Sequence, residues 1–403
     1  MEEESIRVLH TGDWRLDQPC RGITHYPTAL AARLASATQE SVGRIIEFAI
    51  GEKVHAVVVG GNILDPLLAA PSDYGYLLSQ LERLQSAAIP VIWNWSWLDR
   101  RQHWPRCFVW PDNVTQFIGE SPQVITQPIN NDSQLTFIGL EVTSQQEFDF
   151  NWFEGLKFDG PAFGVGYGQH NGFTVDCAIQ HWLLSGEPYG TDCPEGGIQV
   201  YYSGSPQGRD LKDTGPHGAS LIELKTDGNV ECQFINTSTH EYQRLSLNGS
   251  AVSSKSELLD LIIDAVRLRS FDSSIIYTIT VHLTATGSFL RAFQFLDEYP
   301  ELMTSVQTLF TEFAPNLIFA GISTESAETS NISAEQEVLG EYLFVINELR
   351  DKGWTDLRLQ SLLLPSNDNA WSHLHEDLTG LDTLRMAEHL GIHLFNGTNE
   401  DAA

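Results

Sequence analysis

The stretch Ile6-Arg7-Val8-Leu9-His10-Thr11-Gly12-Asp13-Trp14-Arg15-Leu16-Asp17 leads from a short apolar strand into a polar loop. Residues 27–50 follow with apolar side chains at helical spacing, and residues 54–59 then form an apolar run that Gly60-Gly61 ends. A second helix over about residues 72–87 and a strand over residues 90–93 continue the alternation. This order is typical of an α/β protein with a parallel sheet, whose functional sites form where the strands end.

Shorter, strand-like segments follow residue 120. Candidate strands cover residues 135–140, 163–166, 199–202 and 219–224, and they indicate a second sheet packed on the first. A helical pattern over 256–268 and an alternating strand over 275–283 predict a small α+β unit. Residues 321–334 have the polar composition of a linker, and we expect helices over 335–349 and 379–390. We therefore predict three parts, which cover residues 1–245, 246–320 and 321–403.

Charge is the most informative bulk property of the chain. It has 53 acidic and 23 basic residues, so its formal net charge is -30. Because such a surface repels phosphate backbones, the composition disfavours DNA binding. The best local basic candidate is residues 100–106, which we interpret as a solvated loop.

Other bulk features indicate a protein of the reducing cytoplasm. No uncharged apolar run approaches the roughly 20 residues needed to span a bilayer, so we predict no membrane span. The first residues lack the basic and apolar regions of a secretory signal. Five scattered cysteines, an odd number without a Cys-x-x-Cys pair, indicate free thiols.

The opening loop resembles the first motif of the calcineurin-like metallophosphoesterase superfamily, in particular of SbcD and YhaO-type DNA-repair exonucleases, which have Asp-x-His there. Residues 57–65 are similar to that family's Gly-Asp-x-x-Asp loop and residues 90–99 to its Gly-Asn-His-Asp loop. Residues 198–209 resemble its Tyr-x-Gly-Ser or Tyr-Pro-Gly-Asn-x-Gln-Gly-Arg strand and turn, so the resemblance covers roughly residues 6–245. It implies a four-layer sandwich of two packed mixed β-sheets flanked by helices, with a small α+β capping domain and a helical C-terminal tail.

In this family two divalent ions clamp a phosphodiester and generate the attacking hydroxide. Matched residue by residue, Asp13 keeps a ligand position, while Arg15 replaces a histidine and Asn62 replaces the bridging aspartate. Trp97 stands where the family has a metal-binding asparagine, and Leu98 stands at its catalytic histidine. The resemblance thus implies that the centre of the metal site is lost.

The later ligands are matched in the same way. Tyr167 occupies the position of the metal ligand on the family strand that matches residues 163–168. A neighbouring alignment register places His170 at that position instead. The family's Gly-His-x-His loop best matches residues 180–183, which keeps His181 and replaces the second histidine with Leu183. The resemblance implies two remnant metal ligands, Asp13 and His181.

Elementary electrostatics agrees with this assignment. Arg15 is a permanent cation where a dication would lie, and Asn62 lacks the negative charge that would offset two dications. We therefore expect no bound cofactor. We also predict that Arg15 pairs with Asp13 or Asp65, and that Trp97 and Leu98 fill the space of the ions.

Two hypotheses for function follow. The first is an inactive homologue of a double-strand-break repair nuclease subunit, acting as scaffold or regulator with an SbcC-like or YhaN-like coiled-coil ATPase, or as a homodimer. The alternative is an active phosphoesterase or exonuclease that binds Mn or Mg through an atypical set drawn from Asp13, Asp17, Asn62, Asp65, Asp99, His170 and His181.

Two further patterns allow two interpretations each. The tryptophans at 93, 95 and 97 alternate, and we favour core packing over base stacking or partner contact. The turn at residues 202–209 either cradles a phosphate with Arg209 as its anchor or joins two strands tightly.

Overall fold

The computed structural model describes residues 5–324 except 24–25, 130–133, 159, 171–177, 188, 196–197 and 287–298. Residues 1–324 belong to one compact unit. The helices expected over 335–349 and 379–390 lie outside the described residues, as does the expected linker from residue 325 onward.

The first sheet has six strands in the order β12-β11-β1-β2-β3-β4. Four are parallel, namely β1 (Ile6–Thr11), β2 (Ala56–Val59), β3 (Val91–Trp93) and β4 (Val114–Gln116). Beyond β1, the strands β11 (Gly218–Leu224) and β12 (Val230–Asn236) continue the sheet in antiparallel fashion. The predicted alternation of strands and helices in the first 100 residues is confirmed.

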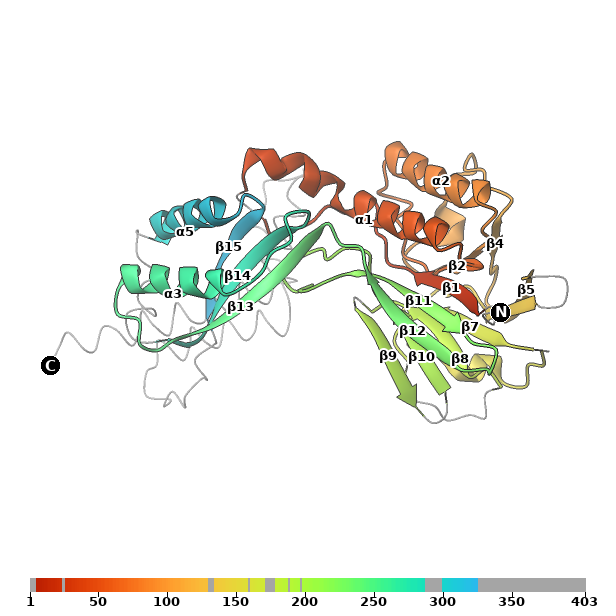
Figure 1. Ribbon diagram of the computed structural model, residues 1–403. Coiled ribbons are helices and arrows are strands. Elements are labelled where there is room, and N and C mark those ends of the chain that lie inside the picture. The colour runs from red at the N-terminus through yellow and green to blue at the C-terminus, as the bar shows by residue number, and fades with distance from the viewer. Residues whose placement is uncertain are drawn as a thin grey trace, which may run out of the picture. The chain divides into compact units, whose positions relative to one another are not determined.

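Two helices cover the outer face of this sheet, as Figure 1 shows: α1 (Ala31–Gly51), which follows a short 3-10 turn η1 (Thr28–Leu30), and α2 (Pro71–Ser86). The buried residues of α1 include Val42, Ile45, Ile46 and Ala49, which recur at helical spacing and therefore form one apolar stripe. Helix α2 begins with a proline at its first position, where the missing N–H carries no cost.

The second sheet also has six strands, in the order β5-β6-β7-β8-β10-β9. Its members are β5 (Gln123–Pro128), β6 (Gln134–Gly139), β7 (Ala162–Tyr167), β8 (His181–Ser185), β9 (Gly190–Glu195) and β10 (Ile198–Ser203). The four inner strands are parallel and the two edge strands antiparallel, so both sheets are mixed, as expected. The segment 219–224, grouped with this sheet in the sequence-based prediction, instead forms β11 of the first sheet, with Leu224 opposite Ile6.

Apolar side chains fill the space between the sheets. Val58 and Ile92 of the first sheet belong to one buried cluster with Phe137 and Leu183 of the second. The outer face of the second sheet carries an aromatic segment with a short 3-10 helix, η3 (Phe150–Phe153), packed around Trp182. Within the described residues, helices therefore flank the first sheet, whereas aromatic side chains take the place of the expected second helical layer.

The tryptophans after β3 do not all share one environment. Trp93 and Trp95 are fully buried and pack edge to face with each other and with Trp104. Their interpretation as core residues is confirmed. Trp97 instead packs against the aromatic cluster of the second sheet, because β3 ends at Trp93 and the strict alternation of a strand ends with it.

A third, parallel sheet follows, with strands β13 (His240–Gly249), β14 (Ile276–Thr286) and β15 (Leu317–Thr324). The helices α3 (Lys255–Arg267) and α5 (Tyr299–Phe313) lie on one face of it (Figure 1). The predicted helix over 256–268 and strand over 275–283 are confirmed as α3 and β14. Residues 321–324, assigned to the linker from the sequence, are the end of β15, and the sheet begins at residue 240.

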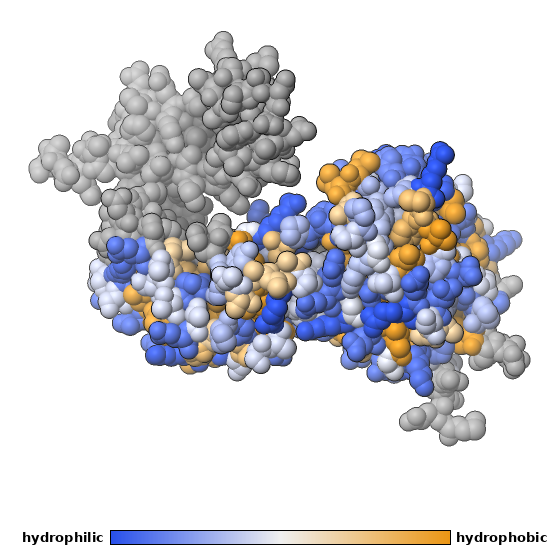
Figure 2. Space-filling model, turned by 90° about the horizontal axis from the view of Figure 1, so that it is seen from above, coloured by the Kyte–Doolittle hydropathy of each residue, from blue (hydrophilic) through white to orange (hydrophobic). Residues whose placement is uncertain are grey.

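The described surface is mostly hydrophilic on the face that Figure 2 shows, with apolar residues in separate patches. Leu67 and Leu68 are among the exposed apolar residues, with exposed fractions of 72% and 76%, and Val109 reaches 75%. They lie on the loops after β2 and β3. Among the described residues, no helix has both the length and the apolar character to cross a membrane.

A glycine tests the packing of the second sheet. A Cβ at Gly164 would lie 2.2 Å from the buried ring of Trp182, so we expect Gly164→Ala to lower the free energy of unfolding by about 1–3 kcal/mol. Gly75→Ala is the matched control, because nothing lies within 4 Å of its added methyl group, and we expect it to stabilise α2 by about 0.5–1 kcal/mol. Equal thermal midpoints for the two variants would contradict this account.

Candidate functional site

Loops at the C-terminal ends of β1 and β2 are fixed to each other by their backbones. The N–H of Asp13 donates to the carbonyl of Gly61 at 2.9 Å, and that of Leu16 donates to Ile63 at 2.9 Å. Asp13, Arg15 and Asn62 have φ angles of 51°, 46° and 55°, in the left-handed region that side chains other than glycine rarely adopt. This strained backbone persists because the hydrogen bonds around it leave no alternative.

The carboxylate of Asp13 is the centre of the site and is 3% exposed. Its Oδ1 accepts hydrogen bonds from Asn62 Nδ2 at 2.5 Å, from Tyr167 Oη at 3.2 Å and from Arg15 Nη2 at 3.3 Å. Its Oδ2 accepts one from the backbone N–H of Gly186 at 2.8 Å. Tyr167 ends β7 and Gly186 follows β8, so this one carboxylate joins the two sheets.

Burial raises the pKa of Asp13, and the nearby charge of Arg15 and the hydrogen bonds from Asn62 and Gly186 oppose that rise. The predicted pairing of Arg15 with Asp13 is confirmed. Asp65 is part of a turn instead, since its carboxylate accepts from the N–H of Leu67 and its own N–H donates to Asp17.

A second buried carboxylate, Asp99, ties the loop after β3 to the loop after β2. It is fully buried and accepts from the N–H of Ile63 at 3.0 Å and from the N–H and hydroxyl of Ser96 at 2.9 and 2.6 Å. The Ser96 hydroxyl in turn accepts from the N–H of Asn62 at 3.1 Å. From the sequence, Asp99 was expected only in the alternative ligand set; its role in joining the two loops depends on the neighbouring Ser96 and on backbone N–H groups.

The side chains at the other degenerate positions are placed by packing. Trp97 and Leu98 are partly buried against the aromatic cluster of the second sheet, to which Tyr167 also belongs. They therefore lie on the side of the site that faces the second sheet. That they fill the space of lost metal ions stays a prediction.

The structure does not bring His181 to this cluster. His181 is the first residue of β8 and stacks on Tyr201, with its Nδ1 3.4 Å from the phenol oxygen. The strand reaches the site only at its last residue, Ser185, about 13 Å further along. Leu183 between them is part of the core between the sheets. The motif was aligned on His181, whereas the residues of this segment that lie beside Asp13 are Ser185 and Gly186.

The alternative ligand His170 is likewise engaged in the second sheet, where its Nδ1 lies 2.8 Å from Tyr202 Oη. His10, which sequence reasoning did not single out, is fully buried with its Nε2 3.3 Å from the hydroxyl of Ser185. Burial lowers the pKa of His10 to about 3, so the ring is neutral. A Cβ at Gly60 would lie 1.9 Å from the Ser185 hydroxyl, which explains the glycine there.

The residues of this cluster do not fit the two divalent ions that the family resemblance implies. Within the described part of the chain, no three His, Cys, Asp or Glu side chains gather in a group that could hold a metal ion. The oxygens of Asp13 already accept four hydrogen bonds, and Arg15 supplies a fixed positive charge beside them. Divalent ions need several oxygen or nitrogen ligands each, which this arrangement does not offer.

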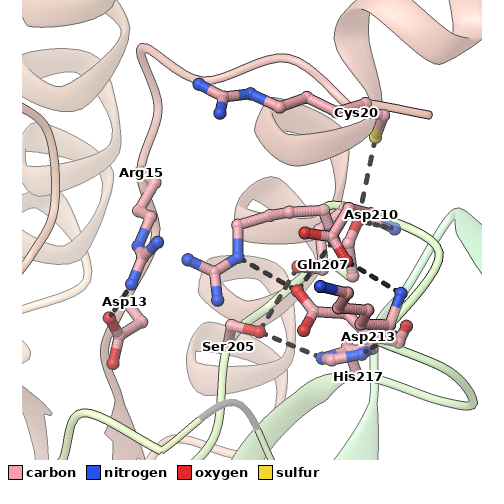
Figure 3. A network of polar contacts seen from close by, with 12 residues as sticks. Asp13, Arg15, Cys20, Ser205, Gln207, Asp210, Asp213 and His217 are labelled. Carbon is pink, nitrogen blue, oxygen red and sulfur yellow. Dashed lines mark hydrogen bonds and ion pairs between the residues drawn. The ribbon is translucent and has the colours of Figure 1, made fainter. Parts of the chain in front are cut away.

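A second polar network lies in the segment after β10 (Figure 3). Asp213 Oδ2 accepts from both the backbone N–H and Nε of Arg209, each at 3.2 Å. The hydroxyl of Ser205 lies 3.0 Å from His217 Nδ1, and Gln207 accepts from the hydroxyl of Ser41 in α1 at 2.9 Å. These side chains hold the segment in place, which is the tight turn that the sequence allowed as one of two interpretations.

The two mixed sheets, the helices on the first of them and the loops at the strand ends agree with the resemblance to the calcineurin-like metallophosphoesterase superfamily. The chain is similar to the uncharacterized metallophosphoesterase YhaO of Bacillus subtilis (strain 168). The two are 22% identical over 315 residues, which are 74% of this chain and 77% of the relative. No family model matches the chain.

Solved structures with similar chains include TT1561 of Thermus thermophilus, at 13% identity over 58% of this chain and 100% of that one, with a TM-score of 0.35. A dimetal phosphatase from Danio rerio is 12% identical over 58% of this chain and 99% of that one, with a TM-score of 0.32.

The buried Asp99 predicts a pH dependence of stability. Burial raises its pKa from 3.8 to about 6, against the hydrogen bonds from Ser96 and Ile63. The folded chain then holds this proton more tightly than the unfolded chain, so the contribution to stability is full below about pH 4 and is lost as pH rises through 6. The difference is about 3 kcal/mol at most. Asp99→Asn should remove it.

We expect urea unfolding to show that the wild type gains stability relative to Asp99→Asn when pH falls from 7 to 4.5. Asp264→Asn, at an exposed carboxyl of α3, serves as the control and should follow the wild type. Parallel profiles for wild type and Asp99→Asn would show that the carboxyl does not titrate in this range.

Proposed function

We propose that this chain is a catalytically inactive metallophosphoesterase homologue that acts as scaffold or regulatory subunit in a DNA double-strand-break repair assembly. The observation that carries the proposal is the engagement of Asp13. Its carboxylate oxygens accept hydrogen bonds from Asn62, Tyr167, Arg15 and Gly186, all of them groups of the chain itself.

The engagement of Asp13 bears on activity because phosphodiester hydrolysis in this family depends on bound metal ions. In two-metal hydrolases the ions generate the attacking hydroxide and stabilise the charge of both the attacking and the leaving oxygen. The guanidinium of Arg15 carries a positive charge and offers only N–H donors, so it can serve neither as a metal ligand nor as a general base. An arginine, an amide and one carboxylate thus replace a centre of two dications and their ligands.

The alternative, an active enzyme with an atypical ligand set, is less well supported. Asp99 is occupied by Ile63 and Ser96, and Asp17 accepts from the backbone of Asp65. His181 lies at the far end of its strand from Asp13. The members of that set therefore do not converge on one point.

The partner in this proposal is a coiled-coil ATPase of the SbcC-like or YhaN-like kind. It rests on the resemblance of residues 339–343 to a helical tail of YhaO-type proteins and on the similarity to YhaO itself. The net charge of -30 favours contact with DNA through a partner over contact through this chain.

Metal content and hydrolysis test the loss of activity. Protein purified without chelator should contain substoichiometric manganese, and with added Mn it should hydrolyse neither bis(p-nitrophenyl) phosphate nor linear DNA above the level of Asp13→Ala. Elemental analysis and initial rates measure these quantities. Stoichiometric manganese, or hydrolysis that Asp13→Ala abolishes, would favour the active alternative.

Pull-down from the native host tests the scaffold role. The tagged full-length chain should retain a coiled-coil ATPase, and Leu339→Asp combined with Leu343→Asp should release it, because buried charges weaken an apolar docking surface. Leu67→Asp with Leu68→Asp is the control at an exposed apolar loop and should have no effect. Loss of the ATPase in the control, or recovery of a monomer alone, would refute docking through the C-terminal region.

A further inference from the structure

Two adjoining cavities are lined mainly by the segment that joins β6 to β7. Their volumes are about 290 and 430 Å³, and both are bordered by Gln146 and Trp152. None of the described residues that line them is basic, whereas four are acidic, namely Glu120, Glu141, Glu147 and Asp149. The two cavities therefore form one acidic depression with an aromatic side chain in common.

Glu141 brings a buried carboxylate to the smaller cavity, and its side chain is only 10% exposed. Its Oε2 accepts from the N–H of Gly119 at 3.0 Å and lies 3.8 Å from Nε of Arg101. No group in the described part of the chain donates a hydrogen bond to its Oε1. Because a buried carboxylate oxygen without a donor is unfavourable, this oxygen indicates a donor from outside the chain.

Trp152 supplies the aromatic surface that the two cavities share. Its ring packs edge to face on Phe148, with the ring centroids 5.4 Å apart, and it is only partly buried. The face of an indole attracts guanidinium and ammonium groups, most strongly where water is partly excluded. An indole bordered by carboxylates is therefore a suitable surface for an organic cation.

Other classes of ligand fit this depression less well. Its carboxylates repel phosphates and other anions. A divalent metal ion needs ligands that converge, and within the described residues no three His, Cys, Asp or Glu side chains form such a group. Carboxylates spread over two adjoining cavities instead suit several cations carried by one chain, since an extended peptide presents alternate side chains about 7 Å apart.

We propose that this depression binds an arginine- or lysine-rich segment of a partner protein. One basic side chain donates to Oε1 of Glu141 and stacks on Trp152, and the carboxylate of Glu147 neutralises a second. The net charge of -30 steers such a segment toward this chain. The inference is independent of the proposed function, because it uses neither the Asp13 cluster nor the residues beyond 324.

Fluorescence anisotropy of a labelled peptide that alternates arginine with glycine tests the site on the full-length chain. We expect saturable binding of one peptide per chain at an ionic strength of about 0.15 M. Trp152→Leu changes no charge and should weaken binding about fivefold or more, because it removes the aromatic surface. Glu120→Gln combined with Glu147→Gln, both at exposed positions, should weaken it by about tenfold.

The matched control is Glu82→Gln combined with Asp264→Asn. It removes the same number of charges from exposed positions on α2 and α3, away from the cavities. We expect its affinity to stay within about twofold of the wild type, because salt screens exposed charges beyond a Debye length of about 8 Å.

Losses of affinity confined to the cavity variants support the inference. Equal losses in the cavity and control variants overturn it, because net charge alone would then attract the peptide. Absence of saturable binding, or wild-type affinity in a folded Trp152→Leu chain, overturns it as well. If the thermal midpoint shows that Trp152→Leu does not fold, the comparison between the two double variants decides.

Discussion

The site depends on the hydrogen bonds that the buried carboxylate of Asp13 accepts. A charge that is removed from water must be met by donors, and here Asn62, Arg15, Tyr167 and the N–H of Gly186 supply them. These donors come from the first sheet and from the second. The strained backbone at residues 13, 15 and 62 follows from the same requirement, because it aims these side chains at one point.

Much of the fold follows from local sequence patterns, because apolar periodicity reports which faces of a helix or strand are buried. It identified α1, α2, β1, β2 and β3 and the small unit that contains α3 and β14. It could not place β11, since a strand pattern states that a segment pairs but does not state with which strand. Partner choice is a property of the tertiary structure, and the antiparallel pairing with β1 appears only there.

The residues of the site likewise separate into those that local sequence patterns predict and those that only the tertiary structure places. Asp13, Arg15, Asn62 and Tyr167 were found from motifs whose spacing is fixed by a strand and the loop that follows it, and the structure brings them together. His181 was matched through a short motif of which this chain keeps only the first histidine, and it lies at the opposite end of β8. The roles of Asp99 and Ser96 were beyond sequence reasoning because they depend on backbone N–H groups, which every residue has.

Side chains of the chain itself hold the loops of this site together. A metal centre leaves its ligands dependent on an ion that a chelator can remove. Here the Asp13 carboxylate pairs with Arg15, and Asp99 and Ser96 tie the adjoining loop through hydrogen bonds. These contacts join the loops after β1, β2 and β3 through groups of the chain itself, so the geometry of the site is fixed by covalently attached donors and acceptors.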